Sequence, residues 1–214
     1  MTDDHDISSI VGHYEKCLRE FGDTPQGMDW PNAQDLARRF EVMAGVVRVP
    51  GRRNEILDLG CGSGLFLDYL RNTDRVPPWR YRGVDISQPM IDMAREKRGE
   101  KYFVQQDILR TPLGAGGFDY VLMNGVLTEK RDLSQTEMVA YAQDMIAAAF
   151  DAARVGIAFN VMSKNVEWER EDLFHWGLDE LTAFLFNKLS RHHIIRGDYG
   201  LYEYTAYVFH TASS

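Results

Sequence analysis

A glycine-rich segment follows a short apolar run and could bind a ligand through its backbone. The run, residues 55–59, is predicted to be a buried strand, and a helix is predicted at 65–71; Gly60–Gly64 between them reads G-C-G-S-G. Glycines leave room where a backbone turns sharply or approaches a ligand, and amides at the start of a helix bind polar groups. Asp58 precedes the glycines, and an acid there disfavours a pyrophosphate but suits an ammonium group, directly or through water.

The glycine spacing separates this loop from the common phosphate-binding loops. Dinucleotide loops read G-x-G-x-x-G and Walker loops end in Gly-Lys-Ser/Thr, and neither pattern is present here. The ammonium of a methionine moiety is therefore a better candidate ligand than a pyrophosphate. We predict that Asp58, Gly60, Cys61 and Gly62 contact this ligand.

A second acid, Asp85, ends the strand predicted at 81–84, about 20 residues beyond the glycine loop. An acid at this position can accept hydrogen bonds from both hydroxyls of a ribose. The alternative is a helix cap, because Asp85 and Ser87 both precede the helix predicted at 89–97. The glycine loop upstream favours the ribose role.

A third acid, Asp107, follows the strand predicted at 102–105 and could accept the amino hydrogen of an adenine. Ile86 and Ile108 could hold the ring between them, and Met90 is predicted to belong to the same site. The alternative is an ordinary surface turn. The order of the three acids along the chain favours adenine binding.

A fourth signal lies where the strand predicted at 118–123 ends in Asn124 and Gly125. Their backbone carbonyls could contact the amine of the methionine moiety. A simple capped strand end is an equally good interpretation, so both remain open.

The elements that must position these residues alternate between strands and helices, which predicts a mostly parallel, doubly wound α/β sheet with ligands at the carboxyl ends of the strands. A capping box of Ser134 and Glu137 begins a long helix, and Asn32 is a plausible cap for an earlier one. The short link between the last two strands requires an antiparallel pair. The remaining predicted helices are 8–21, 32–47, 134–153 and 178–189, and the remaining strands are 155–160, 192–196 and 202–210.

The four signals, in this order, resemble the class I family of methyltransferases that depend on S-adenosyl-L-methionine (SAM). The resemblance covers residues 54–160, and the hairpin at 191–210 matches that family's antiparallel last strand. It implies a Rossmann-like, seven-stranded sheet with six parallel strands, one reversed strand and helices on both faces. It also implies that Asp58, Gly60, Gly62, Asp85 and Asp107 surround SAM as the cofactor.

The flanks resemble a subgroup of small bacterial methyltransferases and supply no acceptor. The matching segments are residues 12–15, 29–32, 158–163 and 198–204. Asn124 is followed by Gly-Val and not by the Pro-Pro-Tyr/Phe of many base and glutamine N-methyltransferases. The sequence therefore argues against a DNA base or a protein glutamine as acceptor.

Methyl transfer displaces a neutral leaving group from a sulfonium, so catalysis needs mainly alignment and exclusion of water. A general base is needed only if the acceptor must lose a proton. The candidate catalytic residues are Glu129, whose alternative is a solvated loop acid, and His13. Tyr14 beside it could contact the sulfonium through its ring, or both could pack a helix that closes over the site.

Composition limits the remaining possibilities. The 214 residues, 44% hydrophobic and 26% charged, suit one domain, 1–214, with an N-terminal helical lid segment at 1–50 and an α/β core at 51–214. A net charge of -8 disfavours nucleic acid as partner. Two cysteines, Cys17 and Cys61, suit a reducing cytoplasm. We expect no membrane span and no metal site, while the oligomeric state remains open.

The leading hypothesis is a SAM-dependent methyltransferase (EC 2.1.1 class) that transfers a methyl group to an oxygen or nitrogen of a small-molecule acceptor, such as a sugar or a related metabolite. One alternative is a non-catalytic SAM-binding or scaffold protein. Another is an NAD-linked or nucleotide-sugar enzyme on a Rossmann sheet, which the glycine spacing disfavours.

Overall fold

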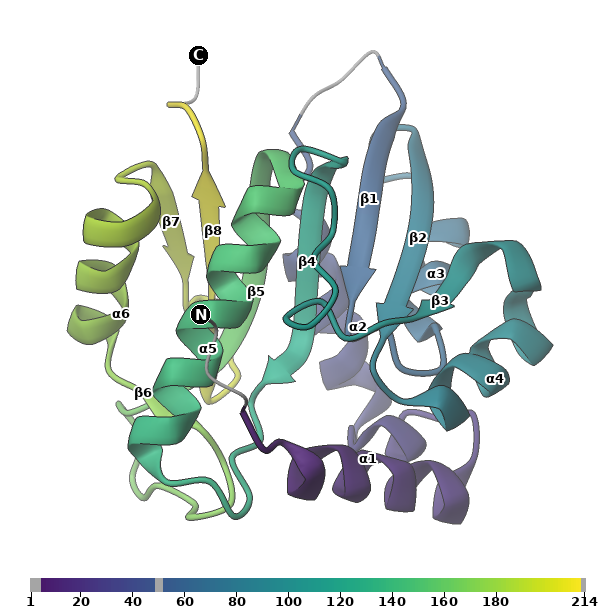
Figure 1. The fold of residues 1–214 in the computed structure, drawn as a ribbon, viewed down its shortest axis with the longest axis horizontal. Helices are drawn as coiled ribbons and strands as arrows, with labels where there is room; N and C mark the ends of the chain where they lie inside the picture. Colours follow the sequence, from purple (N-terminus) through teal and green to yellow (C-terminus); the bar gives the residue numbers. More distant parts are fainter. Residues whose placement is uncertain (1–4, 49–51, 213–214) are drawn as a thin grey trace.

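A computed structural model describes residues 5–48 and 52–212 of the chain (Figure 1). From the sequence, residues 1–6 are also predicted to be disordered, and Pro50–Gly51 is predicted to end the second helix. The first of these segments lies partly outside the described residues, and the second lies wholly outside them. The helices are α1 (Ser8–Phe21), α2 (Ala33–Ala44), α3 (Leu65–Arg71), α4 (Gln88–Arg98), α5 (Gln135–Ala152) and α6 (Leu178–Phe184), which continues as a π turn, Leu185–Leu189. Short 3-10 turns occupy Gln26–Met28 and Glu100–Tyr102.

One mixed sheet forms the centre of the molecule. Its strands are β1 (Asn54–Leu59), β2 (Trp79–Asp85), β3 (Phe103–Gln105), β4 (Phe118–Leu127), β5 (Ala153–Ser163), β6 (His175–Trp176), β7 (His193–Arg196) and β8 (Glu203–Phe209). They lie in the order β3-β2-β1-β4-β5-β8-β7, with β6 paired to the end of β5. Only β8 runs against its neighbours β5 and β7. The predicted Rossmann-like sheet is confirmed, with β6 as one short additional strand.

Helices cover both faces because successive side chains of a strand point to opposite faces. Ile56 of β1 packs in a cluster with residues of α2, α3 and α4. Its neighbour Leu57 packs in another cluster, with α5 and α6. Helices therefore bury both faces of the sheet, which explains why its strands are predominantly apolar, as is usual in parallel sheets.

Helix starts agree with the predicted caps. The side chain of Asn32 accepts hydrogen bonds from backbone amides at the start of α2, and Ser134 and Glu137 form the capping box of α5. The predicted end of α2 at Val47 is wrong. The helix ends at Ala44, and Val46 and Val47 continue as buried non-helical chain.

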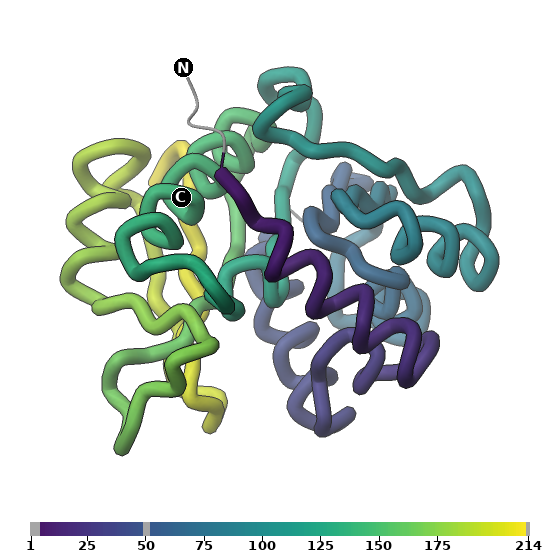
Figure 2. Tube along the Cα trace, turned by 60° about the horizontal axis from the view of Figure 1, so that its bottom comes forward, coloured from purple at the N-terminus to yellow at the C-terminus, as the bar shows by residue number. Residues whose placement is uncertain are grey.

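Helix α1 lies across the carboxyl ends of the parallel strands, as Figure 1 shows at the lower edge of the sheet and Figure 2 shows from below. It contributes the buried side chains Ile10, Cys17 and Leu18 to the interior. The strand ends that carry the four sequence signals are therefore covered by the N-terminal helix. No helix among residues 5–48 and 52–212 has the length and apolarity needed to cross a membrane.

Candidate functional site: a cavity at the carboxyl ends of the strands

The glycine loop after β1 adopts a backbone that only glycine accommodates easily. Gly60, Gly62 and Gly64 have φ angles of 72°, 53° and 91°. A Cβ atom on Gly62 would lie 2.6 Å from the sulfur of Met28, and one on Gly60 would lie 2.3 Å from a methyl carbon of Val126. The loop is thus packed closely while its backbone borders a cavity.

Asp85 connects this loop to the end of β2. Its carboxylate accepts hydrogen bonds from the amide of Gly62, at 2.8 Å, and from the amide of Ser87, at 2.9 Å. Ser87, and not Asp85, is the N-cap of α4, since its side chain accepts from the amide of Met90. Burial raises the pKa of Asp85. The carboxylate also borders the cavity, so the helix-cap alternative does not account for this acid.

Asp58 ends β1 as a buried acid facing the same cavity. The hydroxyl of Tyr81 donates a hydrogen bond of 2.7 Å to its carboxylate. Burial is the main cause that raises the pKa of Asp58 to about 7. A positive group arriving here would stabilise the carboxylate form, because opposite charges favour ionisation.

Two adjoining cavities lie between the strand ends and α1. The first, about 130 Å³, contains Asp58, and the second, about 380 Å³, contains Asp107. Residues that border both are Ile7, Gly60, Asp85, Ile86, Val126 and Tyr141. Because Asp85 borders both cavities, it connects the cavity of Asp58 to the cavity of Asp107, in the order of the three acids along the chain.

The second cavity brings together the residues predicted for an adenine. Ile86, Asp107 and Ile108 all border it. Asp107 also accepts hydrogen bonds from the amide of Leu109, at 2.9 Å, and from that of Arg110, at 3.4 Å. The acid therefore stabilises a turn, as the alternative interpretation expects, and it faces the cavity as well.

The end of the predicted fourth strand differs from the expectation. Gly125 lies within β4, and its carbonyl accepts hydrogen bonds from the hydroxyls of Tyr14, at 3.1 Å, and Thr128, at 2.9 Å. Its amide donates to Asn160 at 2.8 Å. The Gly125 carbonyl is thus already engaged within the protein. The side-chain oxygen of Asn124 is buried without a hydrogen-bond partner and its residue borders the first cavity, so it is the freer polar group.

The other predicted cofactor contacts, Cys61, Met90 and Tyr14, also border the first cavity. Sequence reasoning did not assign a set of apolar residues from α1 to α2 that completes its wall: Ile10, Val11, Met28, Trp30, Leu36 and Phe40. The one sequence feature that pointed to any of these residues is the resemblance of residues 29–32 to other methyltransferases. No local sequence pattern indicates which apolar residues line a cavity and which are buried in the core.

The two candidate catalytic residues border neither cavity. Glu129 is 5% exposed, so the interpretation as a solvated loop acid is wrong. It contacts Nε of Arg131 at 2.6 Å, and burial raises its pKa to about 7. His13 lies on α1, and its Nε2 is 2.8 Å from Asp29 and 2.6 Å from Arg131.

Comparison with known proteins agrees with this geometry. Residues 57–155 match the sequence profile of a methyltransferase domain. A Mycobacterium tuberculosis protein, Rv1506c, which is named as a methyltransferase, is 28% identical over 162 residues, 72% of this chain and 91% of that protein. The malonyl-[acyl-carrier protein] O-methyltransferase of Legionella pneumophila is 35% identical over 94 residues, but this match spans 42% of the chain and 31% of that enzyme.

Solved structures share the fold at lower identity. Magnesium protoporphyrin IX methyltransferase from Synechocystis PCC 6803, crystallised with SAM, is 18% identical with a TM-score of 0.63, covering 99% of this chain and 100% of that one. The 1,6-didemethyltoxoflavin-N1-methyltransferase of Burkholderia thailandensis is 17% identical with a TM-score of 0.65, covering 96% and 88%. The [4+2]-cyclase SpnF is 18% identical with a TM-score of 0.58, covering 87% and 73%.

The sheet order, the glycine loop and the acids at successive strand ends define a SAM-binding α/β domain. Together with the domain match over residues 57–155, they match the class I SAM-dependent methyltransferases in sequence and in fold. S-adenosyl-L-methionine is accordingly its cofactor.

Proposed function

We propose that this protein transfers the methyl group of SAM to an oxygen or nitrogen atom of a small-molecule acceptor, with a sugar or related metabolite among the candidates. The observation that carries the proposal is the pair of adjoining cavities at the strand ends, in which Asp58 borders the first, Asp107 borders the second and Asp85 borders both. SAM supplies an activated methyl group on a sulfonium, and the chain's own residues must hold it and orient the acceptor.

Three acids would hold the cofactor along its length. Asp58 suits the ammonium, because a buried carboxylate without a positive partner gains most from one. Asp85 suits the ribose hydroxyls as an acceptor, and Asp107 suits the adenine amino group. The buried, unpartnered oxygen of Asn124 supports a polar contact at the methionine end.

The apolar residues that line the first cavity, from Ile10 of α1 to Phe40 of α2, would keep water away from the methyl group during transfer. Met28, Trp30, Leu36 and Phe40 border the first cavity, and Met28 also packs against the glycine loop. An apolar wall of this kind favours a small acceptor, because such an acceptor can be enclosed and aligned with the methyl group. Displacement at an activated methyl group requires this alignment and the exclusion of water. The varied acceptors named for proteins of the same fold indicate that the fold itself does not select the acceptor.

Glu129 and His13 remain candidate bases under this proposal. His13 precedes Tyr14 on α1 and Glu129 interacts electrostatically with Tyr14, which borders the first cavity. For either to act on the acceptor, the ion pairs around Arg131 would have to rearrange. Alignment without a general base is the simpler mechanism for this geometry.

Calorimetry with SAM and with its demethylated product tests the binding part. We expect binding in the micromolar range by the intact protein and its loss in Asp85→Ala. A methyl-donor assay over a panel of metabolites, read as release of the demethylated cofactor, tests the transfer. Turnover that depends on one added acceptor supports the proposal, and absence of cofactor binding would overturn it. Unchanged turnover in Glu129→Gln would remove that residue as a base.

A second candidate is a SAM-binding protein whose chemistry is not methylation. This second candidate is retained because the fold of the chain is similar to that of a protein described as a [4+2]-cyclase. The two candidates differ in the fate of the cofactor. Consumption of SAM with each turnover supports methyl transfer, whereas an acceptor converted without loss of SAM supports the second candidate.

A further inference from the structure

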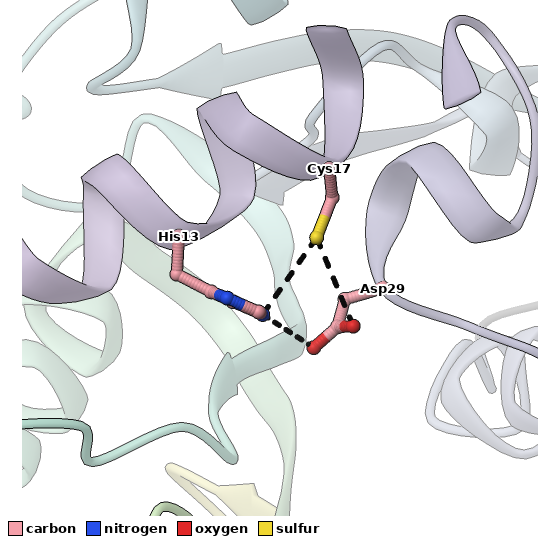
Figure 3. Close-up of side chains that lie close together, drawn as sticks. All are labelled: His13, Cys17 and Asp29. Carbon is pink, nitrogen blue, oxygen red and sulfur yellow. Dashed lines mark hydrogen bonds and ion pairs between the residues drawn. The ribbon is translucent and has the colours of Figure 1, made fainter. Parts of the chain in front are cut away.

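A cluster of potential metal ligands lies outside the cavity, between α1 and the loop that leads to α2. Figure 3 shows His13 and Cys17 on successive turns of α1, with Asp29 facing them from the loop. The spacing of four residues puts His13 and Cys17 on one face of the helix. Asp29 is brought to them by the turn that follows Gln26–Met28.

The three ligand atoms lie within 4.8 Å of one another, which is close enough to share one cation after a small adjustment. Nε2 of His13 lies 2.8 Å from Oδ2 of Asp29. Sγ of Cys17 lies 3.8 Å from that nitrogen and 3.9 Å from Oδ1 of Asp29. Bond lengths of zinc to nitrogen, oxygen and sulfur in a tetrahedral site place such atoms about 3.4–3.6 Å apart. Small side-chain rotations would therefore complete the shell.

Backbone strain is concentrated at the same place. Among the described residues, the two non-glycine residues with positive φ are Asp29, at 59°, and Arg131, at 50°. Arg131 approaches the cluster from the end of β4, with one guanidinium nitrogen 2.6 Å from His13 and 3.8 Å from Asp29. Strained residues persist where surrounding contacts hold them, often at functional sites. The surrounding contacts therefore hold both residues of the cluster in this conformation.

The charges around the cluster leave room for a divalent cation. The carboxylates of Asp29, Glu129 and Asp172 face the guanidiniums of Arg131 and Arg170. Three carboxyl groups thus face two guanidiniums, so the acidic groups outnumber the basic side chains by one. A divalent cation bound together with a Cys17 thiolate would make the cluster neutral, because a bound metal takes up cysteine as the thiolate.

We propose that His13, Cys17 and Asp29 form a binding site for a zinc-class divalent cation that joins the lid helix α1 to the loop before α2. A set of imidazole, thiolate and carboxylate suits zinc or cobalt rather than magnesium or calcium. Three protein ligands leave a fourth position open. The terminal nitrogen of Arg131 competes for the cation position, while its contacts to Glu129 and Asp172 hold the rest of the guanidinium away.

This assignment gives His13 the role of a ligand, not that of a general base. The cation would act on the position of α1, the helix that covers the cavity. The loop pinned by the cation carries Met28 and Trp30, which border the first cavity, and α1 carries Tyr14. A bound cation would therefore hold two sides of the cavity together without touching the reacting atoms.

Titration of the metal-free, full-length protein with Co²⁺ tests the site, with Zn²⁺ competition to measure the zinc affinity. We expect a thiolate-to-cobalt absorption band at one equivalent that Zn²⁺ displaces. The band should vanish in Cys17→Ser and persist in the matched control Cys61→Ser, because Cys61 lies in the glycine loop. His13→Ala and Asp29→Ala should weaken binding by at least about tenfold, whereas Arg131→Gln should strengthen it.

Circular dichroism of each variant establishes that it is folded. If Cys17→Ser does not fold, zinc protection of Cys17 against alkylation in the wild-type protein, mapped by mass spectrometry, replaces it. A missing band, a band that persists in folded Cys17→Ser, or equal zinc affinities in wild type, His13→Ala and Asp29→Ala would each overturn the proposal and leave the cluster as a set of ion pairs only.

Discussion

The hydroxyl of Tyr14 on α1 donates a hydrogen bond of 3.1 Å to the carbonyl of Gly125 in β4. This bond joins the helix that covers the cavity to β4, whose Gly125 borders the same cavity. The same carbonyl also accepts from Thr128, so loss of the Tyr14 hydroxyl alone does not leave it without a partner. The bond therefore affects the position of α1 more than the folding of the core.

Tyr14→Phe should weaken SAM binding about fivefold, since a single hydrogen bond contributes about 1 kcal/mol net. The ring stays, so packing is kept, and calorimetry measures the change. Amide hydrogen exchange should become faster in α1 but not in β4. Tyr202→Phe, in which the altered ring is 65% exposed in the wild type, is the matched control. Equal exchange of α1 in both variants would contradict a role of this bond in holding the helix.

SAM affinity should rise with pH up to about 7 and then level off. Burial raises the pKa of Asp58 to about 7, so at lower pH the carboxyl is protonated and must lose its proton before it can pair with an ammonium. One coupled proton changes the affinity by up to about tenfold per pH unit. Calorimetry at pH 6 and pH 8 in two buffers measures affinity and proton release. Asp58→Asn should bind weakly at both values, and a pH dependence that survives in this variant would assign it to another group, such as Asp85.

The same pKa has an opposite effect on the free protein. The folded-state pKa of Asp58 exceeds its ordinary value of 3.8, so the folded protein holds the proton more tightly than the unfolded chain. This contribution to stability is present below about pH 4 and is lost as pH rises through about 7. Denaturant unfolding of wild type and Asp58→Asn across this range measures it. The difference in unfolding free energy between them should shift in favour of Asp58→Asn as pH rises.

Gly125→Ala should lower the unfolding free energy by about 1–3 kcal/mol. Gly125 has φ of 84°, and a Cβ atom would lie 2.6 Å from a ring carbon of Trp30. Gly114→Ala is the matched control, because nothing lies within 4 Å of its Cβ position. We expect it to change stability by no more than about 0.5 kcal/mol. Similar losses in the two variants would argue against close packing of Trp30 on this glycine.

Arg39→Ala should be strongly destabilising. Nε of Arg39 lies 2.9 Å from Glu203, whose side chain is 1% exposed, and the loss of its partner leaves a buried charge at a cost of about 3–5 kcal/mol. Glu203 also accepts a hydrogen bond from Asn160, which accepts from the amide of Gly125. Arg75→Ala breaks an exposed ion pair with Glu41 and should cost at most about 1 kcal/mol. Thermal unfolding compares them, and equal losses would contradict a special role for the buried pair.

The sequence alone predicted the sheet and the placement of the glycine loop and the acids at its strand ends, because these features are local; their contacts to the cofactor stay a prediction. Gly60–Gly64 occupies a strand-to-helix turn, and Asp58 and Asp85 stand where strands end. In a parallel sheet such ends meet at one edge, so positions along the chain were enough to assemble them. Helix α1 had its bounds predicted correctly for the same reason: periodicity along a helix is a local property.

Only the tertiary structure decided where α1 docks and what its polar face meets. An amphipathic pattern shows that a helix is packed but not against which partner. Tyr14 and Gly125 are separated by 111 positions, and His13 and Arg131 by 118. The burial of Glu129, which the sequence left as a possible surface acid, follows from the same packing. Contacts of this kind depend on the non-local arrangement of several elements, which no periodicity or spacing within one segment records.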